Sequence, residues 1–330
     1  MNILSAKWTR IITLDDLIEQ YWINEDLYEV MKFKANVYEW QQKDKNDEPV
    51  IIQLHQVSAE FKPIHKLVEY QDVLMKLFES KIPVRPSEKE YEWDLLAVIP
   101  HADIHIDRIE HNPKKYLKEV DDRTLRLFDT LLKNKPDRLL YANIGDYFNS
   151  DGNNRTTKWT EMHNSMPERE SFHMWLEHQI NLINQLSSEL PTDVIYVPWN
   201  HDTNKLQYLS DAVDLYYSKT DDVNIDNSLD PRKYYDWGNT KLGFWHGDKI
   251  KDKDILSAFT QETKLKKNNV YMKWHIHHRL TQLFWNLIVE TFWTPAYPSD
   301  FEKRLGYVWR GKLIWQLYDK KTGKYWEYEK

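Results

Sequence analysis

The stretch Asp94-Leu-Leu-Ala-Val-Ile-Pro-His-Ala-Asp-Ile-His105 sets the architecture that we expect for most of this chain. Its unbroken apolar run predicts a buried β-strand. Asp103 and His105 follow directly after the run, so the strand would deliver both side chains at its carboxyl end. Open α/β sheets bind their ligands at that edge. The stretch therefore predicts a polar site at the end of a strand.

The residues that follow alternate between the two kinds of regular structure. Apolar residues recur at helical spacing over 115–133 and 170–190, which predicts two helices. Apolar runs over 139–144 and 193–197 predict the next two strands. Strands that alternate with helices are typical of an α/β domain.

Side chains that favour metal ions gather in five separate clusters. The clusters are Asp103 with His105, Gly145-Asp146 with Asn149, Asn200-His201-Asp202, His246-Gly247-Asp248, and His275 with His277. Residues so far apart cannot form a local metal finger, so they must converge where several strand ends meet. The simplest interpretation is a hydrolase that uses two metal ions.

The order of these clusters resembles that of the calcineurin-like metallophosphoesterases, whose pattern runs D-x-H, G-D-x-x-[DN], G-N-H-[DE], a lone His and G-H-x-H. The resemblance covers residues 94 to about 280, and it extends to phage-type members similar to DNA repair exonucleases through Arg232-Lys-Tyr-Tyr-Asp and Phe244-Trp-His-Gly-Asp-Lys. It implies an α/β fold, in which a β-sandwich is flanked by helices.

The resemblance also implies a role for each matching residue. The expected metal ligands are Asp103, His105, Asp146, Asn200, His246, His275 and His277. Asp146 is expected to bridge the two ions, His201 to donate a proton to the leaving oxygen, and Asp202 to orient His201. The cofactors would be two divalent ions, with manganese expected first and iron, zinc or nickel as alternatives, because mixed nitrogen and oxygen ligands suit all four.

Three further residues are candidates for substrate binding. Asn149 ends the second motif, and Arg155 and Lys158 lie in a polar loop just beyond it. The two cations could hold phosphate groups. An ordinary solvated loop is the alternative for the loop residues.

Two positions depart from the family pattern. Trp199 and Trp274 stand where the family has glycine. Glycine at such positions usually serves a left-handed backbone or a close approach to another segment. The tryptophans could pack in the core, or they could wall the pocket and stack on an aromatic substrate.

Composition places further limits on the function. The chain has 330 residues, 41% of them hydrophobic, which suffices for a large domain and a smaller one. A formal net charge of −7 argues against nucleic-acid binding through overall charge. A local basic groove is still compatible with this net charge. Cysteine is absent, so any metal must sit on oxygen and nitrogen. No stretch approaches the ~18 apolar residues of a membrane span, so we expect a cytoplasmic protein without a membrane partner.

We expect a small N-terminal α+β module with its linker over residues 1–92 and the main domain over 93–330. The module would hold helices at 14–22 and 26–34 and a strand at 50–57. It could be a winged-helix-like adaptor or a packing extension of the main domain. The proline-rich segment 83–92 is the expected linker.

The C-terminal part has short runs typical of strands at 279–284, 306–318 and 325–328. We expect them to form the second sheet of the sandwich.

Three functions stay open at this stage. The first is a DNA nuclease or exonuclease, with nucleic acid as the substrate. The second is a small-molecule or nucleotide phosphodiesterase, or a protein phosphatase. The third is a catalytically inactive binding protein. The sequence carries no signal for an oligomeric state.

Overall fold

The computed structural model describes residues 2–7, 12–20, 23, 28–43, 49–63, 94–108, 112–247, 251–274, 279–298, 303–304, 306 and 311–329.

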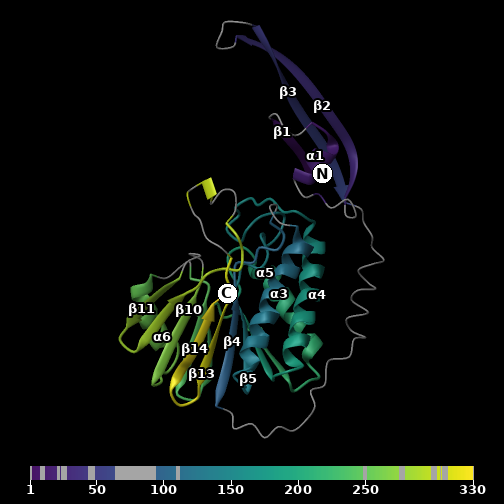
Figure 1. Cartoon of the computed structure of the whole chain (residues 1–330). Helices are drawn as coiled ribbons and strands as arrows, with labels where there is room; N and C mark the ends of the chain where they lie inside the picture. Colours follow the sequence, from purple (N-terminus) through teal and green to yellow (C-terminus); the bar gives the residue numbers. More distant parts are fainter. Residues whose placement is uncertain are drawn as a thin grey trace.

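A six-stranded sheet forms the centre of the main domain (Figure 1). Its strands lie in the order β14 (Gly323–Glu329), β13 (Ile314–Asp319), β4 (Leu95–His101), β5 (Arg138–Asn143), β6 (Thr192–Tyr196) and β7 (Val223–Asp226). Neighbouring strands from β4 to β7 run parallel, whereas β13 is antiparallel to both β4 and β14. The parallel strands therefore end at one edge, as the sequence predicts.

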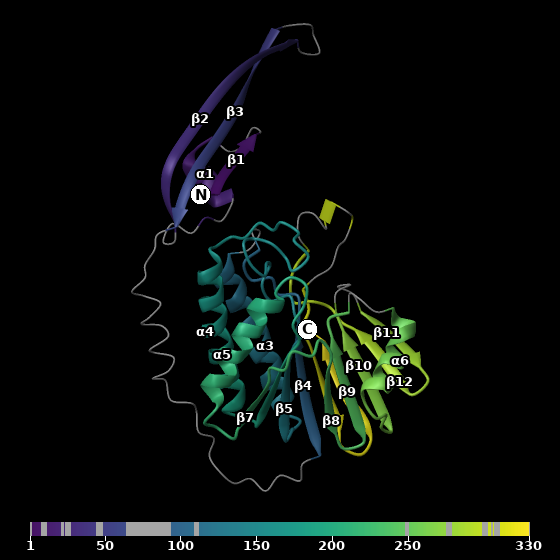
Figure 2. The same ribbon diagram turned by 180° about the vertical axis from the view of Figure 1, so that it is seen from behind.

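Three helices cover one face of this sheet (Figure 2). They are α3 (Pro113–Leu132), α4 (Glu168–Ser187) and α5 (Thr203–Tyr217). α3 begins where its sequence directs, because the Asn112 side chain accepts a hydrogen bond from the Lys115 amide at 3.0 Å and Pro113 fits the first turn. Ile99 and Tyr141 of the sheet share a buried cluster with Trp175 of α4.

A second sheet packs against the other face of the first. Its strands lie in the order β11 (Leu280–Phe284), β12 (Leu287–Thr291), β10 (Asn268–Lys273), β9 (Thr240–Trp245) and β8 (Lys233–Trp237). Val98 and Leu140 of the first sheet share an apolar cluster with Phe244 and Met272 of the second. The outer face of the second sheet packs against α6 (Asp252–Glu262) through Phe259, whose ring lies edge-on to that of Tyr271. The expected α/β sandwich flanked by helices is confirmed.

The C-terminal strands differ in part from the expectation. β11 belongs to the second sheet, as predicted. β13 and β14 instead extend the first sheet, since β13 pairs with β4 from Gln316 opposite Val98 to Asp319 opposite Leu95. The sequence of a short strand does not indicate its partner strand, because pairing depends on segments that are distant in the sequence.

The N-terminal residues form a three-stranded antiparallel sheet with one helix. α1 (Leu14–Gln20) begins at a reciprocal cap between Thr13 and Asp16, as expected. β1 (Asn2–Lys7) and the long strand β2 (Tyr28–Lys43) flank β3 (Pro49–Pro63).

The helix predicted at 26–34 is wrong over its described part, because residues 28–34 lie in β2 and pair with β3. The long ladder supplies the backbone hydrogen bonds that a short helix would have made, so sheet pairing prevails over local spacing. The strand expected at 50–57 is confirmed within β3. The predicted linker 83–92 and the boundary at 92/93 lie outside the described residues. In the part of the chain described here, no helix is long and apolar enough to cross a membrane.

Candidate metal centre

Four of the five motifs lie at carboxyl ends of parallel strands. The first three follow β4, β5 and β6 of the first sheet, and His246 follows β9 of the second. Backbone hydrogen bonds join the loops: the Asp103 amide donates to the Gly145 carbonyl at 3.1 Å, and the His105 amide donates to the Asp146 carbonyl at 3.1 Å. The loops after β4 and β5 are thus joined at one polar edge of the first sheet, and His246 of the second sheet contacts the same edge through the Ile144 carbonyl.

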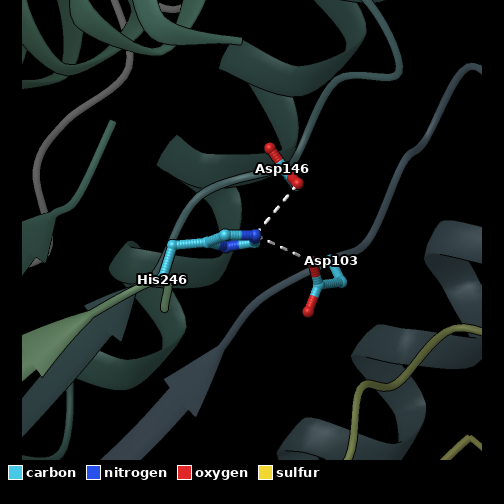
Figure 3. Close-up of side chains that lie close together, drawn as sticks. All are labelled: Asp103, Asp146 and His246. Carbon is cyan, nitrogen blue, oxygen red and sulfur yellow. Dashed lines mark ion pairs between the residues drawn. The ribbon is translucent and has the colours of Figure 1, made fainter. Parts of the chain in front are cut away.

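Three side chains converge there within reach of a single ion (Figure 3). Nε2 of His246 lies 3.1 Å from Oδ2 of Asp146 and 3.6 Å from Oδ1 of Asp103. One ligand atom from each of the three residues lies within 4.8 Å of the other two. All three are buried, with at most 3% of any of them exposed. Buried acids and a histidine in such a group are a typical ligand set for a divalent metal.

The backbone is strained at three of the predicted ligands. Asp103, His105 and Asp146 have φ values of 52°, 47° and 54°, in the left-handed region that residues other than glycine seldom adopt. Such conformations persist only where the surrounding structure enforces them, and they cluster at ligand-binding sites. Here the hydrogen bonds between the loops after β4 and β5 enforce them.

Electrostatics tie His246 to its two acidic neighbours. Burial alone would lower its pKa, but the carboxylates of Asp146 and Asp103 outweigh burial and raise the pKa to about 10. The same pairing holds the pKa of Asp146 well below its usual range, although burial opposes this shift. Nδ1 of His246 lies 3.0 Å from the Ile144 carbonyl. This contact orients the ring so that Nε2 faces the acids, the arrangement usual for a metal-binding histidine.

Two further buried atoms fit a metal centre. Nδ1 of His105 and Oδ1 of Asn200 are both buried, and neither has a hydrogen-bond partner among the described residues. A buried polar atom without a partner is costly, unless an ion or water completes its contacts. Burial also lowers the pKa of His105 well below its usual range, which keeps the imidazole neutral and able to act as a ligand. The donor set therefore suits a divalent ion held by nitrogen and oxygen.

His201 stands at the edge of this centre. Its amide donates to Oδ1 of Asp146 at 3.1 Å, and its ring lies edge-on to that of His105 with 4.9 Å between centroids. Nδ1 of His201 lies 3.0 Å from the carbonyl oxygen of Asn149. The ring is thus oriented by a backbone carbonyl.

Asp202 has a different task from the one expected. Its carboxylate accepts hydrogen bonds from the amides of Asp146, Tyr147 and Phe148, at 3.3, 2.6 and 3.2 Å, whereas Nδ1 of His201 faces the Asn149 carbonyl. The geometric reason is that Asp202 precedes α5, and this start of the helix contacts the loop that follows β5. Burial and the nearby charge of Asp146 raise the pKa of Asp202. Asp202 therefore fixes the backbone that carries Asp146.

Asn149 is also placed differently from the expectation. It is buried, and its side-chain amide donates to Oδ1 of Asn164 at 2.9 Å and to the His163 carbonyl at 3.1 Å. These contacts commit the amide to the protein interior, whereas substrate binding needs an open side chain. The contribution of Asn149 is the carbonyl that orients His201.

Sequence reasoning missed Asp107. This buried carboxylate accepts hydrogen bonds from the Asn149 amide at 2.7 Å and from the Ser171 hydroxyl at 3.0 Å. It thereby fixes the residue whose carbonyl holds His201. The available signal was its spacing, because it continues the alternating series of Asp103 and His105.

The two tryptophans at the positions where the resembled pattern has glycine are core residues. Trp199 is 4% exposed and stacks beside the His246 ring at 5.7 Å, and Trp274 is 1% exposed and stacks on Phe292. Neither has a positive φ. Glycine is needed instead at Gly145, where an added Cβ would lie 2.8 Å from the Trp199 Cβ. Packing is confirmed, and burial leaves neither ring free to stack on a substrate.

The remaining predicted residues are exposed on a loop or lie outside the described chain. Arg155 and Lys158 are exposed on the loop that follows Asn149. His275, His277 and Asp248 lie outside the described residues, so their expected roles stay predictions.

Comparisons with known proteins add a limited likeness. No protein-family model and no curated protein match the chain. Similar solved structures include a conserved uncharacterized protein from Streptococcus pneumoniae, described as a predicted phosphoesterase, with 13% identity, 72% of this chain and 98% of that chain covered, and a TM-score of 0.31. A novel archaeal phosphodiesterase is 12% identical to this chain. The match covers 71% of this chain and 99% of that one, with a TM-score of 0.35. Vps29 of Chaetomium thermophilum is 13% identical to this chain. The match covers 71% of this chain and 97% of that one, with a TM-score of 0.32. Scores this low carry no argument about function, which rests on the geometry of the site.

Proposed function

We propose that this chain is a metal-dependent phosphoesterase of the calcineurin-like type, and that it hydrolyses phosphodiester bonds in DNA. The observation that carries the proposal is the convergence of Asp103, Asp146 and His246 at the carboxyl edge of the sandwich. The buried, unpartnered atoms of His105 and Asn200 supply further ligand positions beside them. His275 and His277 complete the proposed ligand set.

Bound divalent ions would supply positive charge for the phosphoryl oxygens and a hydroxide nucleophile at neutral pH. The chain itself supplies the proton for the leaving group. In the protonated ring of His201, the Nδ1 hydrogen stays bonded to the Asn149 carbonyl, so Nε2 is the atom that donates. The partial exposure of His201 lets a substrate oxygen reach that atom.

DNA is proposed as the substrate because exposed cations lie on the loop beside the centre. Arg155 and Lys158 are both exposed there, and Thr157 between them binds the carbonyl of Asn200 through its amide at 2.9 Å. A strand whose scissile phosphate sits at the centre would place neighbouring phosphates near these cations.

The test is hydrolysis of bis-p-nitrophenyl phosphate and of labelled single-stranded and duplex DNA, with manganese and with a chelator. We expect manganese-dependent cleavage of both substrate types by the parent. Asp146→Ala should lose more than ~100-fold in rate, because it removes a central ligand and a carboxylate that holds His201. Asp129→Ala replaces an exposed aspartate of α3 and should cleave like the parent.

Cleavage of the small ester alone would support a compact phosphodiesterase and contradict the nuclease. Absence of all metal-dependent cleavage by the folded parent would contradict the proposal and favour a binding protein.

A further inference from the structure

A tightly built loop presents one tryptophan to solvent beside the metal centre. Trp159 is 76% exposed. Its amide donates to the Thr156 carbonyl at 2.9 Å, and the Thr156 amide donates to the Thr160 carbonyl at 2.9 Å. Its φ of 64° is a conformation that a bulky residue avoids. The backbone therefore holds this ring outward instead of letting it fold onto the protein.

The same loop is tied directly to the site. The amide of Thr157 donates to the Asn200 carbonyl at 2.9 Å, and its hydroxyl donates to the same oxygen. Asn200 carries a buried, unpartnered side-chain oxygen and precedes His201. Two residues of extended chain span at most about 7 Å, so Trp159 lies close to this anchor. The loop that carries the ring is thus anchored at a residue of the candidate centre.

A cation accompanies the exposed ring. The Arg155 guanidinium lies 5.7 Å from the centroid of the Trp159 ring, and Arg155 is itself exposed. An exposed π-face with an arginine beside it has the chemistry to take a nucleobase and its phosphate together. Stacking is also insensitive to overall charge. It can therefore hold a strand on a protein whose net charge of −7 disfavours binding through phosphate neutralisation alone.

We propose that Trp159 is a stacking subsite for an unpaired nucleobase of the strand being cleaved. This inference rests on the proposed function and adds a preference to it. In a duplex both faces of each base are covered by neighbouring base pairs, whereas a single strand or a frayed end can offer a base to the ring. The protein therefore prefers single-stranded DNA.

The first test measures binding without cleavage. A short oligothymidylate containing one 2-aminopurine is titrated into the protein in chelator, and the quenching of its fluorescence is followed. Trp159→Ala should bind about 5- to 150-fold more weakly, the range for one stacked base, and Trp159→Phe should recover part of the loss.

The matched control is Trp285→Ala. Trp285 is 85% exposed and also has a positive φ, of 58°. It lies in the turn between β11 and β12, at the end of the second sheet away from the carboxyl end of β10. This variant should bind the strand like the parent. Equal binding by Trp159→Ala and the parent would overturn the subsite.

The second test separates the subsite from the proposed function. With manganese, the ratio of kcat/KM for the single strand to kcat/KM for bis-p-nitrophenyl phosphate should fall about 5- to 150-fold in Trp159→Ala, mainly through KM. An unchanged ratio in an active enzyme would overturn the subsite alone. If the parent cleaves nothing yet binds the strand through Trp159, the proposed function fails and the stacking subsite stands.

Discussion

At the residue scale, the centre depends on charges that balance one another in a buried space. Without metal, the imidazole of His246 supplies the positive charge that offsets Asp103 and Asp146. A metal ion would take over that task, and the ring would have to lose its proton in order to bind it. Metal binding and proton release are therefore coupled at this site.

This coupling predicts how the stability of the metal-free protein depends on pH. The folded-state pKa of His246, about 10, lies above the ordinary value of 6.5. The contribution of His246 to the free energy of unfolding is therefore fully present below pH 6.5 and is lost as the pH rises toward 10. We expect the unfolding free energy in chelator to fall across this window, by at most about 1.4 kcal/mol per pH unit for this one proton.

Urea unfolding at a series of pH values measures this slope. His246→Gln should flatten the curve between pH 6.5 and 10, whereas His163→Gln, at an exposed position, should leave it unchanged. A parent curve that is already flat in this window would show that His246 does not carry the charge.

At the element scale, the loop after β5 is held in place by Asp202, the residue that precedes the first residue of α5. Asp202 accepts three backbone hydrogen bonds from that loop. Asp202→Ala would leave three buried amides without their acceptor, so we expect the unfolding free energy to fall by about 2–4 kcal/mol and metal affinity to fall with it. Asp202→Asn keeps one acceptor oxygen, so it should retain part of the stability and part of the metal affinity.

Denaturant unfolding and calorimetric manganese titration measure the two effects. Asp214→Ala on the same helix is the control and should change neither by much. Normal metal affinity in a folded Asp202→Ala protein would mean that the loop keeps its shape without this carboxylate.

The elements also show what sequence can and cannot predict. Motifs that follow an apolar run could be located, since β4, β5 and β6 deliver Asp103, Asp146 and Asn200 at their ends. The partner of Asp202 could not, because it depends on how closely two loops approach each other. Most strands of the second sheet were not predicted, because they have only five or six residues each and the pairings of β10 with β9 and β12 join segments that are separated in the chain.

At the scale of the whole molecule, the two sheets are joined by an ionic cluster as well as by apolar packing. Glu290 of β12 is 3% exposed and accepts hydrogen bonds from Arg279 at 3.2 Å and from Lys324 of β14 at 2.8 Å. Gln316 of β13 donates to the same carboxylate at 2.8 Å. One buried acid thus connects β12 of the second sheet with β13 and β14 of the first.

Removing that acid should weaken the sandwich as a unit. Glu290→Ala removes one acceptor from Arg279, Lys324 and Gln316, which all keep Glu327 as a partner, and we expect a loss of about 1–3 kcal/mol in unfolding free energy. Glu290→Gln should lose less, because it keeps an acceptor. Glu189→Ala, at an exposed position, should stay within about 0.5 kcal/mol of the parent in urea unfolding. A Glu290→Ala protein as stable as the parent would show that Glu290 does not help to join the sheets.

The pairing of β13 with β4 has a consequence for how the chain is made. β4 lies inside the first sheet, but the partner on one of its sides is synthesised only after β5 to β12. During translation the parallel strands can assemble early, while that side of β4 stays open until residue 319 has left the ribosome. An open strand edge invites pairing with other chains. Nascent chains of this protein therefore pass through a stage at which a chaperone would have a defined edge to protect.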